Sequence, residues 1–412
     1  MTDAYIIDAV RSPRGIGKAG KGSLSEFHSS RLLAKVFEAI GERNNLNSED
    51  VDDVIVGCST QVGNQGSCIG RMAALDAGWS TSASAVTLDR FCGSGITSVN
   101  LAAANIMSGM DDLCVAGGVE MMSYTATLTP QNNNRTVDAG NLHLRAQHPQ
   151  PHQGICADMI ATLEGFSRED LDALAVQSQL RAKHAMDNGY FDKSLIAITN
   201  DDGTVALDRE EFPRPGTTME TLAELKTVFD QFMGLPIDDT GETFDQLVKR
   251  QYPDLVINHV HHAGNSSGVV DGAAAIILSN LEYANKVGWK PRARIRAMAT
   301  VGGSPTLMLN EPVPAARKAL ARAGMTTDDI DLFEVNEAFS VVAAKFIRDL
   351  ELDPEKVNVN GGAMALGHPI AATGSMLIGT VLDELERRDL STGLVTMCTG
   401  GGMAPAIIIE RV

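Results

Sequence analysis

Two stretches of this chain repeat the same pattern of charged and apolar residues about 280 positions apart, the spacing expected of a duplicated unit. The first pair is Asn47-Ser-Glu-Asp-Val-Asp-Asp-Val-Ile-Val56 and Thr326-Thr-Asp-Asp-Ile-Asp-Leu-Phe-Glu-Val335. The second pair is Asp111-Asp-Leu-Cys-Val-Ala-Gly-Gly118 and Thr392-Gly-Leu-Val-Thr-Met-Cys-Thr-Gly-Gly-Gly402. Chance similarity between short amphipathic segments is the alternative, but the nearly constant spacing favours a duplicated α/β unit.

Within the first copy, short β-rich runs alternate with an Ala-rich stretch. Residues 53–57 read as a buried strand, 94–107 as a helix that ends near Gly109, and 112–118 as the next strand. A strand–helix–strand order predicts a parallel sheet, so the fold class is α/β.

The middle of the chain has a different character. Residues 130–153 are rich in Asn, Gln, His and Pro and predict a loop, whereas 167–190 predict a helix capped by Ser167 and Asp170. Residues 200–265 are mixed and polar. We therefore expect four segments: a first half at 1–119, an inserted loop domain over the active site at 120–265, the return of the first half at 266–285, and a second half at 286–412.

The net charge of −18 over 412 residues argues against a nucleic-acid or membrane-surface binder. The N-terminus lacks a secretory pattern, and no apolar run approaches the roughly 18 residues of a membrane span. The cytoplasm is the expected compartment. An anionic ligand would need a local basic patch, because the overall field repels it.

Six cysteines are present, without a Cys-x-x-Cys pair or a zinc-finger spacing. We expect free thiols in a reducing compartment. Four of them are predicted to be small buried apolar residues: Cys58, Cys68, Cys114 and Cys156.

The other two cysteines and one histidine lie in Gly-rich turns. Cys92 precedes Gly-Ser-Gly at the start of a helix, where the dipole and free N–H groups are expected to lower the pKa of its thiol. His368 lies in Ala-Leu-Gly-His-Pro, with Pro369 suited to the first helical position, and Cys398 leads into three glycines. A nucleophilic thiol, a base and a second thiol indicate covalent acyl transfer. Asn336, directly after a predicted strand at 331–335, could hold an oxygen atom or simply cap a helix.

Six segments together resemble the thiolase family, the acetyl-CoA acyltransferases. They occur in the family's order along nearly the whole chain: Ile6-Ile-Asp-Ala-Val-Arg-Ser-Pro-Arg14, Phe91-Cys-Gly-Ser-Gly95, Ala263-Gly-Asn-Ser-Ser267, Asn336-Glu-Ala-Phe339, Gly361-Gly-Ala-Met-Ala-Leu-Gly-His-Pro369 and Cys398-Thr-Gly-Gly-Gly-Met403. The resemblance implies a duplicated five-layered α-β-α-β-α fold with an inserted loop domain.

The resemblance also implies roles for five residues. Cys92 would be the acylated nucleophile, His368 its activating base, and Cys398 the acid/base at the α-carbon of acetyl-CoA. Asn336 would hold a water that forms one oxyanion hole with His368. The backbone N–H groups of Cys92 and Gly400 would form the other.

For ligands, the resemblance implies coenzyme A as co-substrate and neither a permanently bound cofactor nor a metal. Arg214 would lie near the nucleotide, Thr221 and Ser267 along the pantetheine, and His152 in the thioester pocket. A homodimer or homotetramer is implied, with acyl-CoA and CoA as partners.

The chain departs from the family's pattern in four places. Ala371 and the pair Ala404-Pro405 stand where the family has glycines, and residues 231–258 look like an insertion. His259, His261 and His262 follow it, where the family more often has Val or Thr; metal binding by these three is an alternative. Substrate length is the property that these changes affect most.

The implied activity is CoA-dependent cleavage of 3-ketoacyl-CoA, as in fatty-acid β-oxidation, or the reverse Claisen condensation. One alternative is a dedicated short-chain acetoacetyl-CoA thiolase. Two others are a non-catalytic acyl-CoA or lipid-binding protein and a Cys/His hydrolase. The presence of both cysteines and the histidine argues against a non-catalytic binding protein. The second thiol argues against a hydrolase, which would not need it.

Overall fold

The computed structural model describes residues 2–128 and 136–412. Within these ranges ten strands form one extended sheet, ordered β10-β11-β12-β9 in one half and β1-β8-β5-β3-β4 in the other, with β2 paired to β8. The halves meet where β1 pairs antiparallel with β9 at Tyr5–Arg294 and Ile6–Ala293. The strands are β1 Tyr5–Arg11, β2 Gly15–Ile16, β3 Asp53–Gly57, β4 Ser84–Leu88, β5 Leu113–Met121, β8 Val270–Ser279, β9 Ala293–Gly302, β10 Leu332–Val335, β11 Thr392–Thr396 and β12 Met403–Arg411.

The two halves repeat each other down to single hydrogen bonds. The parallel pair β3–β5 corresponds to the parallel pair β10–β11. The Asp52 carboxylate accepts from the N–H groups of Asp112 and Leu113 at 2.8 and 3.0 Å. Asp331, its counterpart, accepts from Ser391 and Thr392 at 2.8 and 2.9 Å. The duplicated unit predicted from the sequence is confirmed.

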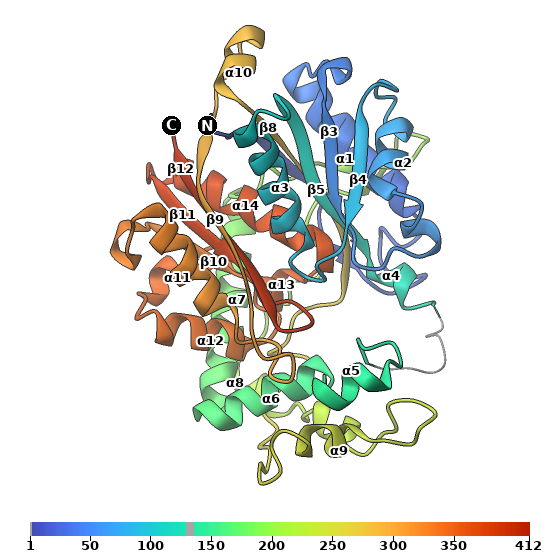
Figure 1. Ribbon diagram of the computed structural model, residues 1–412, viewed down its shortest axis with the longest axis vertical. Coiled ribbons are helices and arrows are strands. Elements are labelled where there is room, and N and C mark those ends of the chain that lie inside the picture. Colours follow the sequence, from blue (N-terminus) through green and yellow to red (C-terminus); the bar gives the residue numbers. More distant parts are fainter. Residues whose placement is uncertain (1, 129–135) are drawn as a thin grey trace.

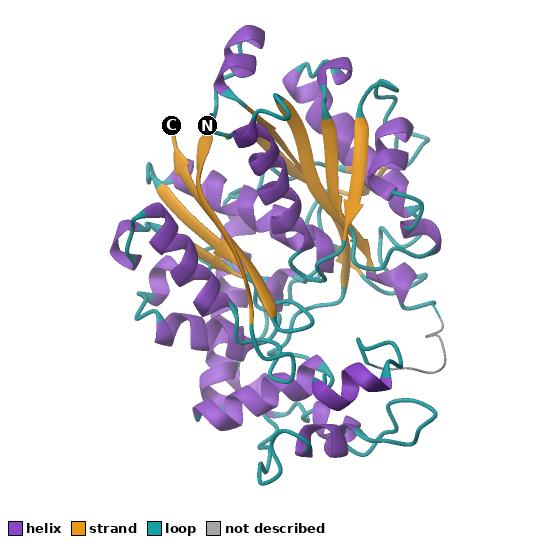
Figure 2. Ribbon diagram, viewed as in Figure 1, coloured by secondary structure: helices purple, strands orange, loops and turns teal. Residues whose placement is uncertain are grey.

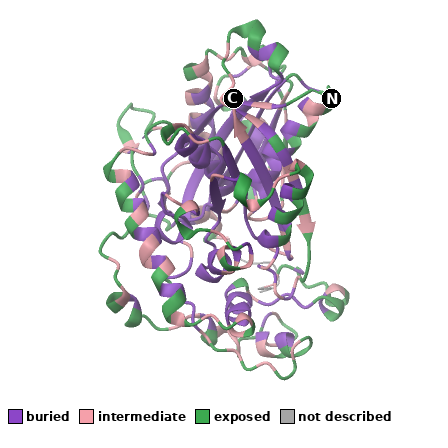
Figure 3. Ribbon diagram, turned by 90° about the vertical axis from the view of Figure 1, so that its left-hand side faces the viewer, coloured by how far each residue is buried: buried purple, intermediate pink, exposed green. Residues whose placement is uncertain are grey.

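Helices divide the molecule into five layers (Figures 1 and 2). α3 (Ser94–Ser108) and α14 (Ile370–Arg387) pack between the two halves of the sheet, in a core built from both copies. α1 (Ser29–Asn44) and α2 (Ile69–Asp76) cover the outer face of the first half. α11 (Pro312–Ala323) and α12 (Ser340–Asp349) cover that of the second. Burial is therefore greatest along the inner strands, such as β5 and β8, and along the two central helices (Figure 3).

The segment between β5 and β8 forms the lower part of Figure 1 and packs on the second half through α6 and α12. The predicted helix after Ser167 is confirmed, with a capping box between Ser167 and Asp170. The four-segment domain division remains a prediction.

The elements between β5 and β8 are α4 Met122–Thr125, α5 Leu142–Gln147, α6 Gln153–Glu164, α7 Arg168–Asp187, β6 Ile198–Thr199, β7 Val205–Leu207, α8 Met219–Ala223, the 3-10 helix η4 Phe229–Phe232 and α9 Phe244–Lys249. The remaining short elements are α10 Leu281–Val287, α13 Ala363–Leu366, η1 Ser48–Asp50, η2 Gly63–Gln65, η5 Thr327–Asp329 and η6 Pro354–Lys356.

Three local predictions are wrong. The loop expected at 130–153 contains α5, whose N-cap Asn141 accepts from the N–H of Leu144; residues 130–135 of that loop lie outside the described residues. Cys68, expected to be buried, is exposed at the N-cap of α2. β5 continues past Gly118, because its pairing with β8 extends to Met121.

Candidate active site

The two helices in the middle layer bring Cys92 and His368 together. Cys92 precedes α3 and His368 precedes α14. The helices touch at two glycines: a Cβ on Gly95 would lie 2.7 Å from the carbonyl oxygen of Ala371, and one on Gly374 would lie 2.4 Å from the backbone nitrogen of Ile96. Because the backbones meet directly, both helix starts face one small region. Pro369 is the N-cap of α14 rather than its first residue, one position from the prediction.

Cys92 opens onto a cavity of about 190 Å³, which Gly400, His152 and Met308 also line. Burial raises the pKa of the Cys92 thiol to about 12, and nearby Glu120 acts in the same direction. Hydrogen bonding from the backbone N–H groups of Cys92 and Gly400 lowers that pKa but does not outweigh burial. The expected lowering of the Cys92 pKa is therefore wrong for the free protein, since the helix-start N–H groups act inside a desolvated site.

His368 is buried and held by one hydrogen bond. Its Nδ1 lies 2.6 Å from the hydroxyl of Thr373, one turn into α14. Its Nε2 is buried and has no hydrogen-bond partner within residues 2–128 and 136–412. Burial, together with the positive charge of Arg14, lowers the pKa of His368 to about 3. The imidazole is therefore neutral at physiological pH, and with Nδ1 protonated its free Nε2 would carry the lone pair of a general base.

Cys398 and Asn336 complete the set of side chains that the sequence singled out. Cys398 follows β11 and is buried, and both burial and the neighbouring Cys92 raise the pKa of its thiol. Asn336 follows β10, and neither amide atom has a hydrogen-bond partner in the described chain. A buried amide with both atoms unpaired is suited to hold a polar group that arrives from elsewhere.

A second, larger hollow of about 550 Å³ contains three of the four residues predicted to bind CoA: Arg214, Thr221 and Ser267. Lys18 also lines it and supplies positive charge in an acidic protein. Gly268, which also lines the groove, accepts a hydrogen bond through its carbonyl from the backbone N–H of His368 at 2.9 Å. His152, the fourth residue, lines the Cys92 cavity instead, and its place in a thioester pocket stays a prediction.

The three clustered histidines are paired with aspartates. His259 and His261 each place Nδ1 against the Asp158 carboxylate, at 2.6 and 2.7 Å, and His262 Nε2 lies 2.8 Å from Asp172. No group of three or more His, Cys, Asp or Glu side chains within residues 2–128 and 136–412 is arranged to hold a metal ion.

Sequence reasoning missed the residues that support the site. The Thr373 hydroxyl orients the His368 ring, and the positive charge of Arg14 lowers the pKa of His368. Glu334 and Asn336 line the same small cavity of about 10 Å³. Thr373 could have been found from its position one helical turn after His368. Arg14 and Glu334 lie in segments noted above, but no local pattern places them near His368 and Asn336, because tertiary packing alone brings them here.

Residues 4–235 match the N-terminal domain of thiolases, and residues 289–411 match the thiolase C-terminal domain. The chain belongs to the thiolase family. It is 37% identical to a 3-ketoacyl-CoA thiolase of Alcanivorax borkumensis, over 100% of this chain and 98% of that protein. It is 38% identical to a 3-ketoacyl-CoA thiolase of Shewanella oneidensis, with both chains fully covered. The acetyl-CoA acetyltransferase of Bacillus anthracis superposes with a TM-score of 0.85 at 32% identity, over 100% of this thiolase and 99% of that chain. Of the helices in the described ranges, none is long and apolar enough to cross a membrane.

Proposed function

We propose that this thiolase cleaves 3-ketoacyl-CoA with a second CoA, giving acetyl-CoA and a shortened acyl-CoA, and that it runs the reverse condensation at the same site. The observation that supports this most is the pairing of two thiols in one buried site. The Cys92 thiol accepts a hydrogen bond from the backbone N–H of Gly400. Cys398 lies close enough for the charge of Cys92 to raise the pKa of the Cys398 thiol. A hydrolase needs only one of these thiols.

In the first half-reaction, His368 Nε2 takes the Cys92 proton as the sulfur attacks the ketone carbon. The bond between the α- and β-carbons breaks, its electron pair passes to the α-carbon, and Cys398 supplies the proton that releases acetyl-CoA. The N–H groups of Cys92 and Gly400, and a water held by Asn336 with His368, stabilise the oxyanions. In the second half-reaction the incoming CoA thiol gives its proton to Cys398. CoA takes the acyl group, and Cys92 recovers its proton from His368.

CoA is the proposed co-substrate and no permanently bound cofactor takes part. The groove of Arg214, Thr221 and Ser267 supports CoA binding, because it combines positive charge with a wall residue, Gly268, that is hydrogen-bonded to the backbone of His368. We also propose a homodimer or homotetramer and a cytoplasmic location. The six free cysteines are in keeping with a reducing compartment.

The decisive experiment mixes the protein with acetoacetyl-CoA and CoA and follows loss of the substrate absorbance. Cys92→Ser should abolish cleavage and prevent a mass increase on that peptide, whereas Arg214→Ala should raise the KM for CoA with little change in kcat. Full activity of Cys92→Ser would refute the assignment. CoA binding without cleavage of any substrate would instead support a non-catalytic thiolase-like protein.

A further inference from the structure

The inserted residues 231–258 lie behind the wall of the Cys92 cavity, where they contact the lining residue His152. One side of that cavity is formed by the catalytic turns, and the other by Val137, His152 and Gln153 of the loop domain. The insertion contacts this second side at two separate places. We therefore ask which parts of the cavity wall these two contacts support.

The first contact surrounds His152 with aromatic rings. Phe229 stacks on the imidazole at 5.6 Å between centroids, and Phe232 and Phe244 meet it edge-on at 5.0 and 6.3 Å. Phe232 and Phe244 belong to the insertion. His152 Nδ1 also accepts from the N–H of Gly154 at 3.1 Å, which fixes the ring at the start of α6.

The burial of this aromatic cluster lowers the pKa of His152 to about 4, so the ring is neutral at physiological pH. Contact with three phenylalanine rings favours one orientation of this neutral imidazole in the cavity wall. The wall formed by His152 is therefore as rigid as the aromatic cluster behind it.

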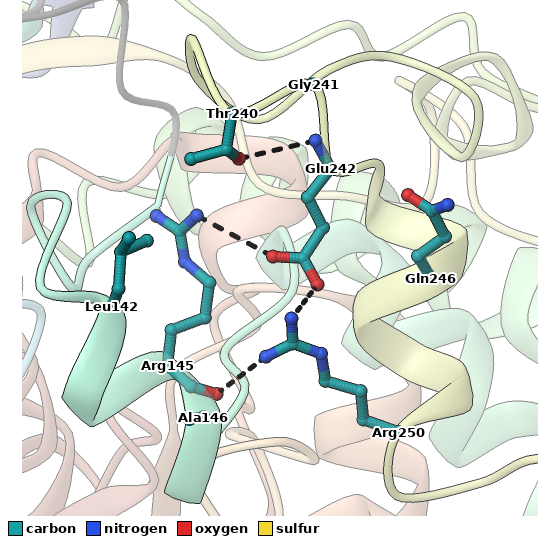
Figure 4. Close-up of a pocket in the computed structure, with 8 residues that line it drawn as sticks. All are labelled: Leu142, Arg145, Ala146, Thr240, Gly241, Glu242, Gln246 and Arg250. Carbon is teal, nitrogen blue, oxygen red and sulfur yellow. Dashed lines mark hydrogen bonds and ion pairs between the residues drawn. The ribbon is translucent and has the colours of Figure 1, made fainter.

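The second contact is an ion-pair network centred on Arg145 (Figure 4). Arg145 is 1% exposed and grips the Asp138 carboxylate with Nε and Nη2, both at 2.8 Å. Its Nη2 also lies 2.7 Å from Asp238, and its Nη1 lies 3.7 Å from Glu242, which in turn pairs with Arg250. Asp238, Glu242 and Arg250 all belong to the insertion.

This network matters because Asp138 directly follows Val137, which lines the Cys92 cavity. Around the network, a hollow of about 630 Å³ separates α5 from α9. Across this hollow, Arg145 of α5 is joined to the insertion by its ion pairs with Asp238 and Glu242. The insertion thus holds one cavity wall through aromatic rings and another through ion pairs.

We propose that residues 231–258 are the frame of the acyl pocket and limit it to short and medium acyl groups; this inference rests on the proposed thiolysis at Cys92. The cavity of about 190 Å³ gives the scale of this limit. A methylene group is about as large as a water molecule, whose share of liquid volume is about 30 Å³, so the pocket holds on the order of six carbons. A six-carbon acyl group on Cys92 corresponds to an eight-carbon 3-ketoacyl-CoA.

The test compares kcat/KM over 3-ketoacyl-CoAs of 4 to 16 carbons for the wild type, Phe232→Ala and Asp238→Asn. Phe232 is half-buried, so its truncation should be tolerated. The kcat/KM of the wild type should fall at least tenfold between substrates of 8 and 12 carbons. For the 12-carbon substrate, the kcat/KM of each variant should be at least threefold higher than that of the wild type. Asp245→Asn is the matched control, because among residues 2–128 and 136–412 the Asp245 side chain pairs only with the neighbouring Lys249 on the surface of α9. Its chain-length profile should equal that of the wild type.

A second measurement needs no catalytic turnover. Alkyl methanethiosulfonates convert the Cys92 thiol to a mixed disulfide and release methanesulfinate. Their rates are followed by mass spectrometry of the Cys92 peptide, so that reaction at the exposed Cys68 is counted separately. The rate should fall beyond a hexyl chain in the wild type and recover in Phe232→Ala.

Equal wild-type rates from 4 to 16 carbons would overturn the inference, as would unchanged profiles in both variants. If the wild type cleaves no substrate, the proposed function fails. The disulfide series then still decides whether the insertion limits the pocket.

Discussion

Gly374→Ala tests whether direct backbone contact between α3 and α14 positions the catalytic pair. The new Cβ would lie 2.4 Å from the nitrogen of Ile96 and 3.0 Å from the carbonyl carbon of Gly95, about 1 Å inside ordinary contact. Backbone atoms cannot turn aside, so the helices must separate. Overpacking of this kind costs about 1–3 kcal/mol, and the better helix propensity of alanine recovers about 1 kcal/mol.

We therefore expect a net loss of roughly 1 kcal/mol, or a fall in Tm of about 1 °C for a chain of this length. The effect on activity should be far larger. A displacement of about 1 Å between reacting groups can cost on the order of 100-fold in rate. Because Cys92 and His368 stand at the starts of these helices, kcat/KM for acetoacetyl-CoA should fall about 100-fold.

Gly379→Ala is the matched control on the same helix. Its Cβ would meet only the Cβ of Ala9, at 3.3 Å, so Tm and kcat/KM should stay near the wild-type values. The reasoning is refuted if Gly374→Ala keeps full activity, or if both variants lose activity equally.

Three further predictions concern the site and its support. Since burial raises the pKa of Cys92 to about 12, its alkylation by iodoacetamide without substrate should accelerate about tenfold per pH unit from pH 7 to 10; a plateau below pH 9 would contradict this. Burial, reinforced by neighbouring carboxylates, raises the pKa of Glu334 well above its usual range. Above about pH 4.3 the folded protein keeps the Glu334 proton, whereas the unfolded chain loses it. The free energy of unfolding should therefore fall as the pH rises, and Glu334→Gln should lose this pH dependence in denaturant titrations. Asp158→Ala should cost about 3 kcal/mol in urea unfolding, because it leaves His259, His261 and two backbone N–H groups without their acceptor; a loss below 1 kcal/mol would exclude that support.

The sequence was informative where the determinants are local. The repeated strand patterns, the helix after Cys92 and the capping box at Ser167 depend on residues a few positions apart, and they appear as predicted. The groove of Arg214, Thr221 and Ser267 was reached through a motif resemblance, and the structure brings these residues together.

Long-range packing explains what could not be read from the sequence. Gly117 and Gly118 look like the end of a strand, yet both lie inside β5, where a Cβ would meet the carbonyl oxygens of Ala274 and Ala371 at 2.1 and 2.2 Å. The pKa of Cys92 depends on burial and on Glu120 rather than on the helix start alone. The partners of the three histidines lie about 90 to 100 positions away, and no local pattern points to them.

The crossing at Gly95 and Gly374 has a consequence for how such a site could arise. These glycines stand at the same position of the two repeats and meet face to face between the halves of the sheet. Two identical ancestral units related by a twofold axis would have presented the same residue twice to any ligand at that point. Once the units were joined in one chain, each could mutate alone. One helix start could then keep a nucleophile while the other acquired the base that serves it. Linked and diverged copies thus allow the two sides of this axis to carry different side chains, which two copies of one identical unit would not.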